Sequence, residues 1–183
     1  MGIRFEAPSY EKLAEEIDDV LKVYLDAFAA PPYGDAERHT RRMRDTLPHH
    51  AERPGWKTCI ARDDDSGRII GFTYGQSGVA GTWWYDNVAR AAGKARTRRW
   101  LEGCFELTEL AVAPEYQGKG VGGRLHDMLL EGLPHRTAVL STLAAETPAL
   151  ALYRKRGWQV VVDSMVFPNG TRPFSILGLD LPR

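Results

Sequence analysis

The stretch from Leu107 to Leu130, LTELAVAPEYQGKGVGGRLHDMLL, constrains the fold more than any other part of the chain. An apolar run over 107–112 stops before Pro114, and a glycine-rich turn follows over 117–123. After the turn, apolar residues recur at helical spacing, at Leu125, Met128, Leu129 and Leu133. The pattern predicts a strand, a tight turn and an amphipathic helix.

The turn carries glycines at alternate positions, 118, 120 and 122. Glycine has no Cβ, so the backbone can approach a ligand closely there. Free N–H groups in the turn and in the first helical turn attract anions, and the helix dipole adds to this attraction. Lys119 and Arg124 add positive charge. The stretch therefore predicts a phosphate or pyrophosphate site, and the alternative is a glycine-rich turn without a ligand.

Two common phosphate motifs do not fit this turn. The dinucleotide pattern G-x-G-x-x-G is not met, and the Walker pattern with Gly-Lys-Ser/Thr is absent. The turn instead resembles the acyl-CoA loop of the GCN5-related N-acetyltransferases (the GNAT family), Gln/Arg-x-x-Gly-x-Gly/Ala, through Gln117, Gly120 and Gly122. A later segment, PALALYRKRGW, resembles the second signature of that family. One departure is Glu146, near a position where many relatives carry Asn.

The order of the expected elements also resembles this family. Apolar patterning predicts strands over 3–7, 55–61, 68–74, 107–112, 137–140, 158–163 and 174–181, and helices over 10–28, 36–47, 121–133 and 148–156. The resemblance implies the α/β (α+β) GNAT fold, a mixed central β-sheet flanked by helices, with a splayed strand pair that binds acetyl-CoA. We expect a single domain over 1–183.

The resemblance marks residues 77–103 as an inserted segment, because relatives join these two strands briefly. The segment holds Trp83, Trp84 and Tyr85, followed by a basic run over 94–99. Two interpretations remain open: a lid over the substrate, or a helical excursion that packs its tryptophans inward. Binding of single-stranded nucleic acid is disfavoured, since the aromatic and basic residues lie in separate blocks.

Composition narrows the class of protein further. The formal net charge of zero gives no general attraction to nucleic acid or membranes. Cys59 and Cys104 make neither a disulfide framework nor a metal motif, and the run 63–65 lacks the alternating ligands of a calcium loop. No metal is therefore expected. Without a signal peptide or a membrane-spanning stretch, the expectation is a cytoplasmic protein with no nucleic-acid and no membrane partner.

The resemblance assigns the acetyl-CoA contacts. Backbone groups of Leu110, Ala111 and Val112 would pair with the pantetheine arm, as an unpaired strand edge can do. The turn would hold the pyrophosphate through Gln117, Gly118, Lys119, Gly120, Val121, Gly122 and Gly123.

Two residues are catalytic candidates. In a regular strand, Glu109 shares a face with Phe105, Leu107 and Ala111, and this apolar setting would raise its pKa. Such a carboxylate suits a general base, acting directly or through a water. The alternative is a glutamate at a bulge that faces solvent or an arginine. Tyr153 matches the family tyrosine that protonates the departing thiolate, and its alternative role is packing.

The resemblance thus implies an acetyl-CoA-dependent N-acetyltransferase that acts on a primary amine by direct attack in a ternary complex. Neutral charge and the aromatic insertion favour a small-molecule amine, with an amino-sugar antibiotic as one candidate. Candidate substrate contacts are Trp83, Trp84, Asp35 and Asp86, the aspartates suiting a cationic acceptor. The alternatives are acetylation of a protein or peptide N-terminus and a non-catalytic acyl-CoA-binding module. The protein is expected to be a monomer or homodimer.

Overall fold

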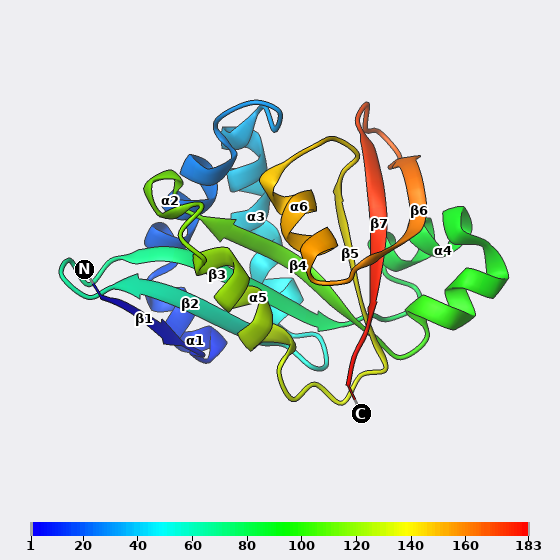
Figure 1. Cartoon of the computed structure of the whole chain (residues 1–183), viewed down its shortest axis with the longest axis horizontal. Coiled ribbons are helices and arrows are strands. Elements are labelled where there is room, and N and C mark those ends of the chain that lie inside the picture. Colours follow the sequence, from blue (N-terminus) through cyan, green and yellow to red (C-terminus); the bar gives the residue numbers. More distant parts are fainter. Residues whose placement is uncertain (1, 183) are drawn as a thin grey trace. The chain divides into compact units, whose positions relative to one another are not determined.

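The computed structural model describes residues 2–182 and divides the chain into two compact units. Unit 1 comprises residues 1–76 and 108–131, and unit 2 comprises residues 77–107 and 132–183. Strands follow one another in the hydrogen-bonded order β1-β2-β3-β4-β5-β7-β6 (Figure 1). β4 (Cys104–Val112) contributes its beginning to unit 2 and its end to unit 1.

Unit 1 begins with β1 (Ile3–Glu6), α1 (Tyr10–Glu15), α2 (Ile17–Phe28) and α3 (Ala36–Ala51). The helix expected over 10–28 is therefore two helices, and Ser9 caps the first, since Ser9 Oγ accepts from Lys12 N. The break falls at Glu16, whose carboxylate accepts two hydrogen bonds from the Arg62 guanidinium, at 2.8 and 2.9 Å. This long-range contact accompanies a break that helical periodicity alone did not reveal.

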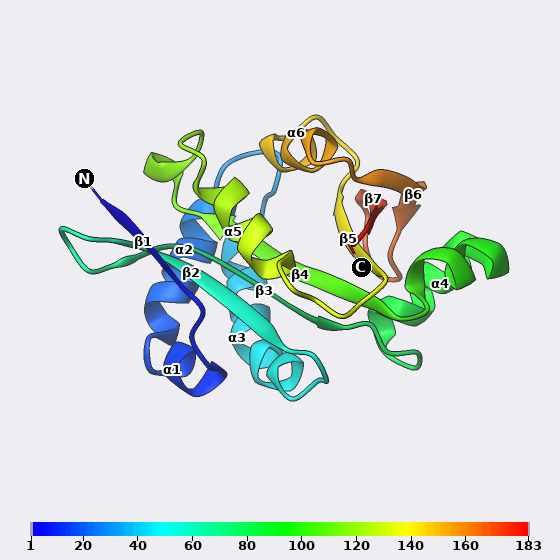
Figure 2. The same cartoon turned by 60° about the horizontal axis from the view of Figure 1, so that its bottom comes forward.

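The strands expected over 55–61 and 68–74 form a hairpin of β2 (Lys57–Asp63) and β3 (Ile69–Ser77), which pair antiparallel. α2 and α3 pack Val20, Leu21, Met43 and Leu47 against one face of these strands, where Ile60 and Phe72 are buried. α5 (Val121–Leu130) covers the other face, and Gly71 leaves just enough room there for Leu125. Figure 2 shows α1 and α3 on one side of the strands and α5 on the other.

Unit 2 contains α4 (Trp83–Arg96), a π-helical turn η1 (Thr97–Leu101), β5 (Thr137–Leu143), α6 (Pro148–Lys155), β6 (Gln159–Val166) and β7 (Pro173–Asp180). β7 pairs antiparallel with both β5 and β6. β5 pairs parallel with the start of β4, in a register that joins Cys104–Glu106 to Thr137–Val139. The sheet is therefore mixed, as the sequence predicts.

The segment expected as an insertion, 77–103, supplies α4 and η1. Their inner side buries Tyr85, Val88, Trp100 and Leu101 in a cluster with Val139, Val161 and Ile176 of the strands. Gly178 of β7 faces the Trp100 ring, and a side chain at this position would overlap that ring. The segment thus forms part of the core of unit 2.

Apart from the division of the first helix and the addition of α4 and η1, the predicted elements are present in the predicted order and differ at their ends. α3 continues through Pro48 to Ala51, β4 begins at Cys104, β5 extends to Leu143, and α5 ends at Leu130. Thr147 caps α6, accepting from Leu150 N at 3.1 Å. Among residues 2–182, no helix is both long enough and apolar enough to cross a bilayer.

Candidate active site

The glycine turn leads from β4 into α5 through a short 3-10 helix, η2 (Pro114–Tyr116). Gly118 and Gly120 have φ angles of 73° and 84°, a left-handed conformation in which side chains are strained. A Cβ at either position would point into open space, with no other atom within 4 Å. The turn is therefore shaped by its glycines and keeps a free surface beside its backbone.

α5 begins at this turn without a side-chain cap, because its N-cap residue is Gly120. The N–H groups in the first turn of a helix have no intrahelical partners. Val121 is buried beneath them, whereas Lys119 and Arg124 are exposed beside them. Open space, free donors and two cations suit a bound phosphate, and the phosphate site stays a prediction.

Two residues outside the predicted site hold the turn in place. The Tyr116 hydroxyl donates to Asp63 Oδ2 at 3.0 Å, and Asp63 Oδ1 accepts from the backbone N and the hydroxyl of Ser66. These hydrogen bonds lower the pKa of the Asp63 carboxyl, and the two from Ser66 have the largest effect. The Lys119 ammonium lies 5.4 Å from the Tyr116 ring centre. The sequence signals turn chemistry at 63–67 but not this link, since 53 residues separate Asp63 from Tyr116.

The side chain of Gln117 also has a partner within unit 1. Its amide nitrogen donates to the carbonyl oxygen of Val112 at 2.9 Å, across the start of the turn. This bond joins the last residue of β4 to the loop. Gln117 therefore stabilises the turn, and its backbone remains the candidate for ligand contact.

The end of β4 carries Glu109, Leu110, Ala111 and Val112 in unit 1. β3 supports this segment, because the Thr73 hydroxyl donates to the Glu109 carbonyl at 2.7 Å. Ala111 and Val112 are buried, and Leu110 is half-buried. The strand expected to hold the pantetheine arm is thus fixed against its neighbour.

Glu109 is half-buried, and the loss of hydration around its carboxyl raises the pKa of that group to about 8. Burial raises the pKa of the Tyr24 hydroxyl on α2. The nearby charge of Glu109 raises the pKa of Tyr24 further. Glu109 can accordingly gain and lose a proton near neutral pH, as general bases must.

Tyr153 lies on α6 in unit 2 and is buried. Its ring meets the ring of Trp158 edge to face, with 5.6 Å between centres. Glu146, the departure from the family pattern, accepts both hydrogen bonds of an exposed pair with Arg154. The ring of Tyr153 therefore packs in the core of unit 2.

The four candidate substrate residues lie in different settings. Asp35 caps α3, accepting from Arg38 N at 3.3 Å, and Asp86 accepts from Gly81 N at 2.8 Å. Trp84 packs against the core of unit 2, and its indole N–H donates to Ser141 Oγ at 3.2 Å. Trp83 stacks on Phe167 and remains 51% exposed. Unit 1 thus holds Asp35, and unit 2 holds the other three.

No group of three or more His, Cys, Asp or Glu side chains within residues 2–182 could hold a metal ion. The fold is an α/β fold with a mixed sheet, and its glycine turn leads into an uncapped helix, an arrangement suited to binding a phosphate.

Comparison with known proteins identifies the family within this class. Residues 17–158 match the acetyltransferase (GNAT) family, so the chain belongs to the GNAT acetyltransferases, which are acetyl-CoA-dependent enzymes. A GCN5-like protein acetyltransferase of Mycobacterium tuberculosis is 29% identical over 199 residues, covering 93% of this chain and 94% of the relative.

Solved structures share the fold. An N-acetyltransferase from Thermoplasma acidophilum, in complex with coenzyme A, superposes with a TM-score of 0.67 at 16% identity, over 98% of this chain and 99% of its own. The ribosomal-protein-S18-alanine N-acetyltransferase of Escherichia coli gives 0.63 at 17% identity, over 100% and 96%. These likenesses confirm the GNAT fold that the sequence resemblance implies.

Proposed function

We propose that the protein transfers the acetyl group of acetyl-CoA to a primary amine by direct attack in a ternary complex, with Glu109 as general base. The proposal rests on the position of Glu109 in the β4 segment that leads into the glycine turn, where loss of hydration raises the pKa of its carboxyl to about 8. The amine nitrogen forms a bond to the thioester carbon, and the carbon–sulfur bond breaks. The proton of the attacking amine passes to the Glu109 carboxylate, directly or through a water.

The glycine turn would hold acetyl-CoA by its pyrophosphate. Support comes from the left-handed Gly118 and Gly120, the uncapped start of α5, and the charges of Lys119 and Arg124. Backbone groups of Leu110, Ala111 and Val112 would pair with the pantetheine arm, at the edge of the splayed strand pair that the family resemblance implies. A backbone N–H from the same segment would stabilise the developing oxyanion.

Tyr153 is proposed to donate the proton that the thiolate takes up as it leaves. The support is its match to the family signature and its buried position on α6. The Trp158 contact would fix the plane of the ring and hence the direction of the hydroxyl.

A protein amine is the first candidate acceptor. The relative that spans nearly the whole chain is named a protein acetyltransferase, and it supports this class of substrate. An amine carried by a protein side chain or N-terminus would meet the same base.

A small-molecule amine, such as an amino-sugar antibiotic, is the second candidate. It is supported by the neutral net charge and by the exposed indole of Trp83, which can stack on a sugar-sized ligand. Asp35 and Asp86 could attract its cationic groups. Asp35 also caps α3, and Asp86 also accepts a hydrogen bond from Gly81 N, just before α4.

A thiol-release assay with three acceptor sets separates these candidates: lysine-containing peptides, peptides with free N-termini and blocked lysines, and small amines. Turnover of the lysine peptides, lost in the Glu109→Gln variant, is the expected result. Turnover with small amines alone would exclude the protein acceptor. Binding of acetyl-CoA without turnover of any acceptor would favour a non-catalytic acyl-CoA-binding module.

A further inference from the structure

One segment of unit 2 presents a concentration of positive charge at its surface. Residues 90–99 hold five of the 24 Lys and Arg residues and no Asp or Glu, although the whole chain is neutral. Arg136, before β5, adds a sixth cation beside them. We call this surface the basic strip, and its exposed members are Arg90, Lys94, Arg96, Arg98, Arg99 and Arg136.

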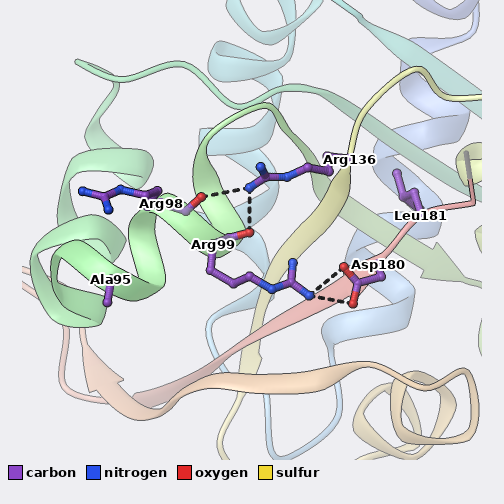
Figure 3. Close-up of a pocket in the computed structure, with 6 residues that line it drawn as sticks. All are labelled: Ala95, Arg98, Arg99, Arg136, Asp180 and Leu181. Atoms are coloured by element: carbon purple, nitrogen blue, oxygen red, sulfur yellow. Dashed lines mark hydrogen bonds and ion pairs between the residues drawn. The ribbon is translucent and has the colours of Figure 1, made fainter.

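The basic strip is built on a rigid support. The opposite side of α4 and η1 is buried in the core of unit 2, through Val88, Trp100 and Leu101. Arg136 Nη2 donates to the carbonyl oxygens of Arg98 and Arg99, at 2.9 and 3.0 Å, and so fixes the end of η1 (Figure 3). A surface that is already ordered loses less conformational entropy when it binds a partner.

The strip is hollowed where η1, the start of β5 and the end of β7 meet. The hollow has a volume of about 630 Å³ and is lined by Ala95, Arg98, Arg99, Arg136, Asp180 and Leu181 (Figure 3). Inside it, Arg99 Nη2 donates to both carboxylate oxygens of Asp180 at 2.8 Å. The hollow thus already binds one carboxylate, which is supplied by the chain itself.

Three cations of the strip are available to a ligand. Within the described residues, the side chains of Lys94, Arg96 and Arg98 make no hydrogen bond or ion pair, and all three residues are exposed. The Arg98 guanidinium points away from the Arg99–Asp180 pair (Figure 3). Exposed like charges that follow closely along the chain and have no partners favour the binding of an anionic molecule.

We propose that the basic strip is a docking surface for an acidic polypeptide segment of a partner protein. Separate Asp and Glu carboxylates can pair with spaced cations, and Arg is well suited to bind them. A single-stranded nucleic acid fits less well, because the residues between the cations, Ala91 to Gly93, Ala95 and Thr97, offer no aromatic ring for base stacking. This docking does not depend on the transferase reaction.

The test measures fluorescence anisotropy of a labelled Glu-rich octapeptide with the full chain, without acetyl-CoA, at low and at physiological salt. Lys94→Glu/Arg98→Glu is the test variant, since neither side chain has a partner to lose. Lys12→Glu/Arg41→Glu, at exposed positions of α1 and α3, reverses the same number of charges and is the charge-matched control. Circular dichroism verifies that both variants are folded.

We expect salt-sensitive binding of the peptide, weakened about tenfold in the double variant and by less than twofold in the control. Equal affinity of wild type and double variant would overturn the proposal. It would also fail if a single-stranded oligonucleotide of equal charge bound more tightly than the peptide, since the surface would then recognise nucleic acid.

Discussion

The Tyr116 hydroxyl donates a 3.0 Å hydrogen bond to Oδ2 of Asp63, and this bond joins the lead-in of the glycine turn to the turn between β2 and β3. The other carboxylate oxygen of Asp63 is held by Ser66. The Lys119 ammonium in turn lies over the Tyr116 ring. The cation of the proposed pyrophosphate site therefore rests on a ring that is fixed by a residue of the β-hairpin.

Removing this hydroxyl should weaken acetyl-CoA binding without affecting the chemistry. Tyr116→Phe is expected to raise the KM for acetyl-CoA by roughly three- to tenfold, the usual worth of one hydrogen bond, with kcat little changed. Steady-state kinetics at fixed acceptor concentration measures both constants. Tyr10→Phe, which removes a hydroxyl from α1, is the control. An unchanged KM would show that the loop keeps its geometry without Asp63.

A side chain at Gly120 should abolish acetyl-CoA binding, because it would occupy the open space beside the turn. The matched control is Gly67→Val in the β2–β3 turn, where φ is 70° and the Cβ would also meet no atom within 4 Å. Both valines should cost about 1–2 kcal/mol of stability through the left-handed conformation. Calorimetry with acetyl-CoA should detect a binding loss in Gly120→Val alone, and equal affinity in the two variants would argue against the site.

Glu109 should give activity its pH dependence. With a pKa of about 8, the carboxyl is mostly protonated well below pH 8 and becomes a base as the pH rises through that value. The rate ratio of wild type to Glu109→Gln should therefore be small at low pH and grow towards a plateau above pH 8. A ratio that does not vary with pH would assign the base to another group.

The same pKa predicts a change in stability, which needs no substrate. Between the ordinary pKa of glutamate and about 8, the unfolded chain binds fewer protons at this site than the folded chain does. Stability due to Glu109 is therefore complete at low pH and falls by about 1.4 kcal/mol per pH unit until the folded carboxyl ionises. Glu109→Gln removes this loss, so its Tm should exceed that of wild type at pH 8 and match it at pH 4.

Tyr153→Phe separates a chemical role from packing. The ring and its contact with Trp158 remain, so the Tm should change little. If the hydroxyl protonates the thiolate, kcat should fall by roughly 10²–10⁴-fold, with acetyl-CoA affinity preserved. Stopped-flow thiol release measures this step. Full kcat in the variant would mean that the thiolate leaves unassisted and that Tyr153 only packs.

The two neighbouring tryptophans should respond differently to truncation. Trp84→Ala removes a ring packed in the core of unit 2 and should lower stability by about 3–5 kcal/mol. Trp83 is half-exposed, so Trp83→Ala should cost much less. Thermal melting is measured beside the acceptor KM. A stable Trp84→Ala variant with a raised acceptor KM would instead support a substrate lid.

The sequence by itself determined the element order and the family, because both can be recognised from patterns of neighbouring residues. Periods of two and of 3.6 residues mark strands and helices, and left-handed turns need glycines such as Gly118 and Gly120. The caps Ser9 and Thr147 are local features too, since each accepts a hydrogen bond from a residue only three positions ahead.

Tertiary structure decided what depends on residues far apart in the chain. Arg62 reaches Glu16 at the break between α1 and α2, and Asp63 reaches Tyr116 beneath the loop. From the sequence, Trp84 could belong either to a substrate lid or to the core. In the folded chain its indole N–H donates to Ser141 of β5. The spacing of Glu109 suggested burial, but the size of its pKa shift depends on the loss of hydration that packing produces. No local pattern encodes these contacts, because each needs two segments that only the folded chain brings together.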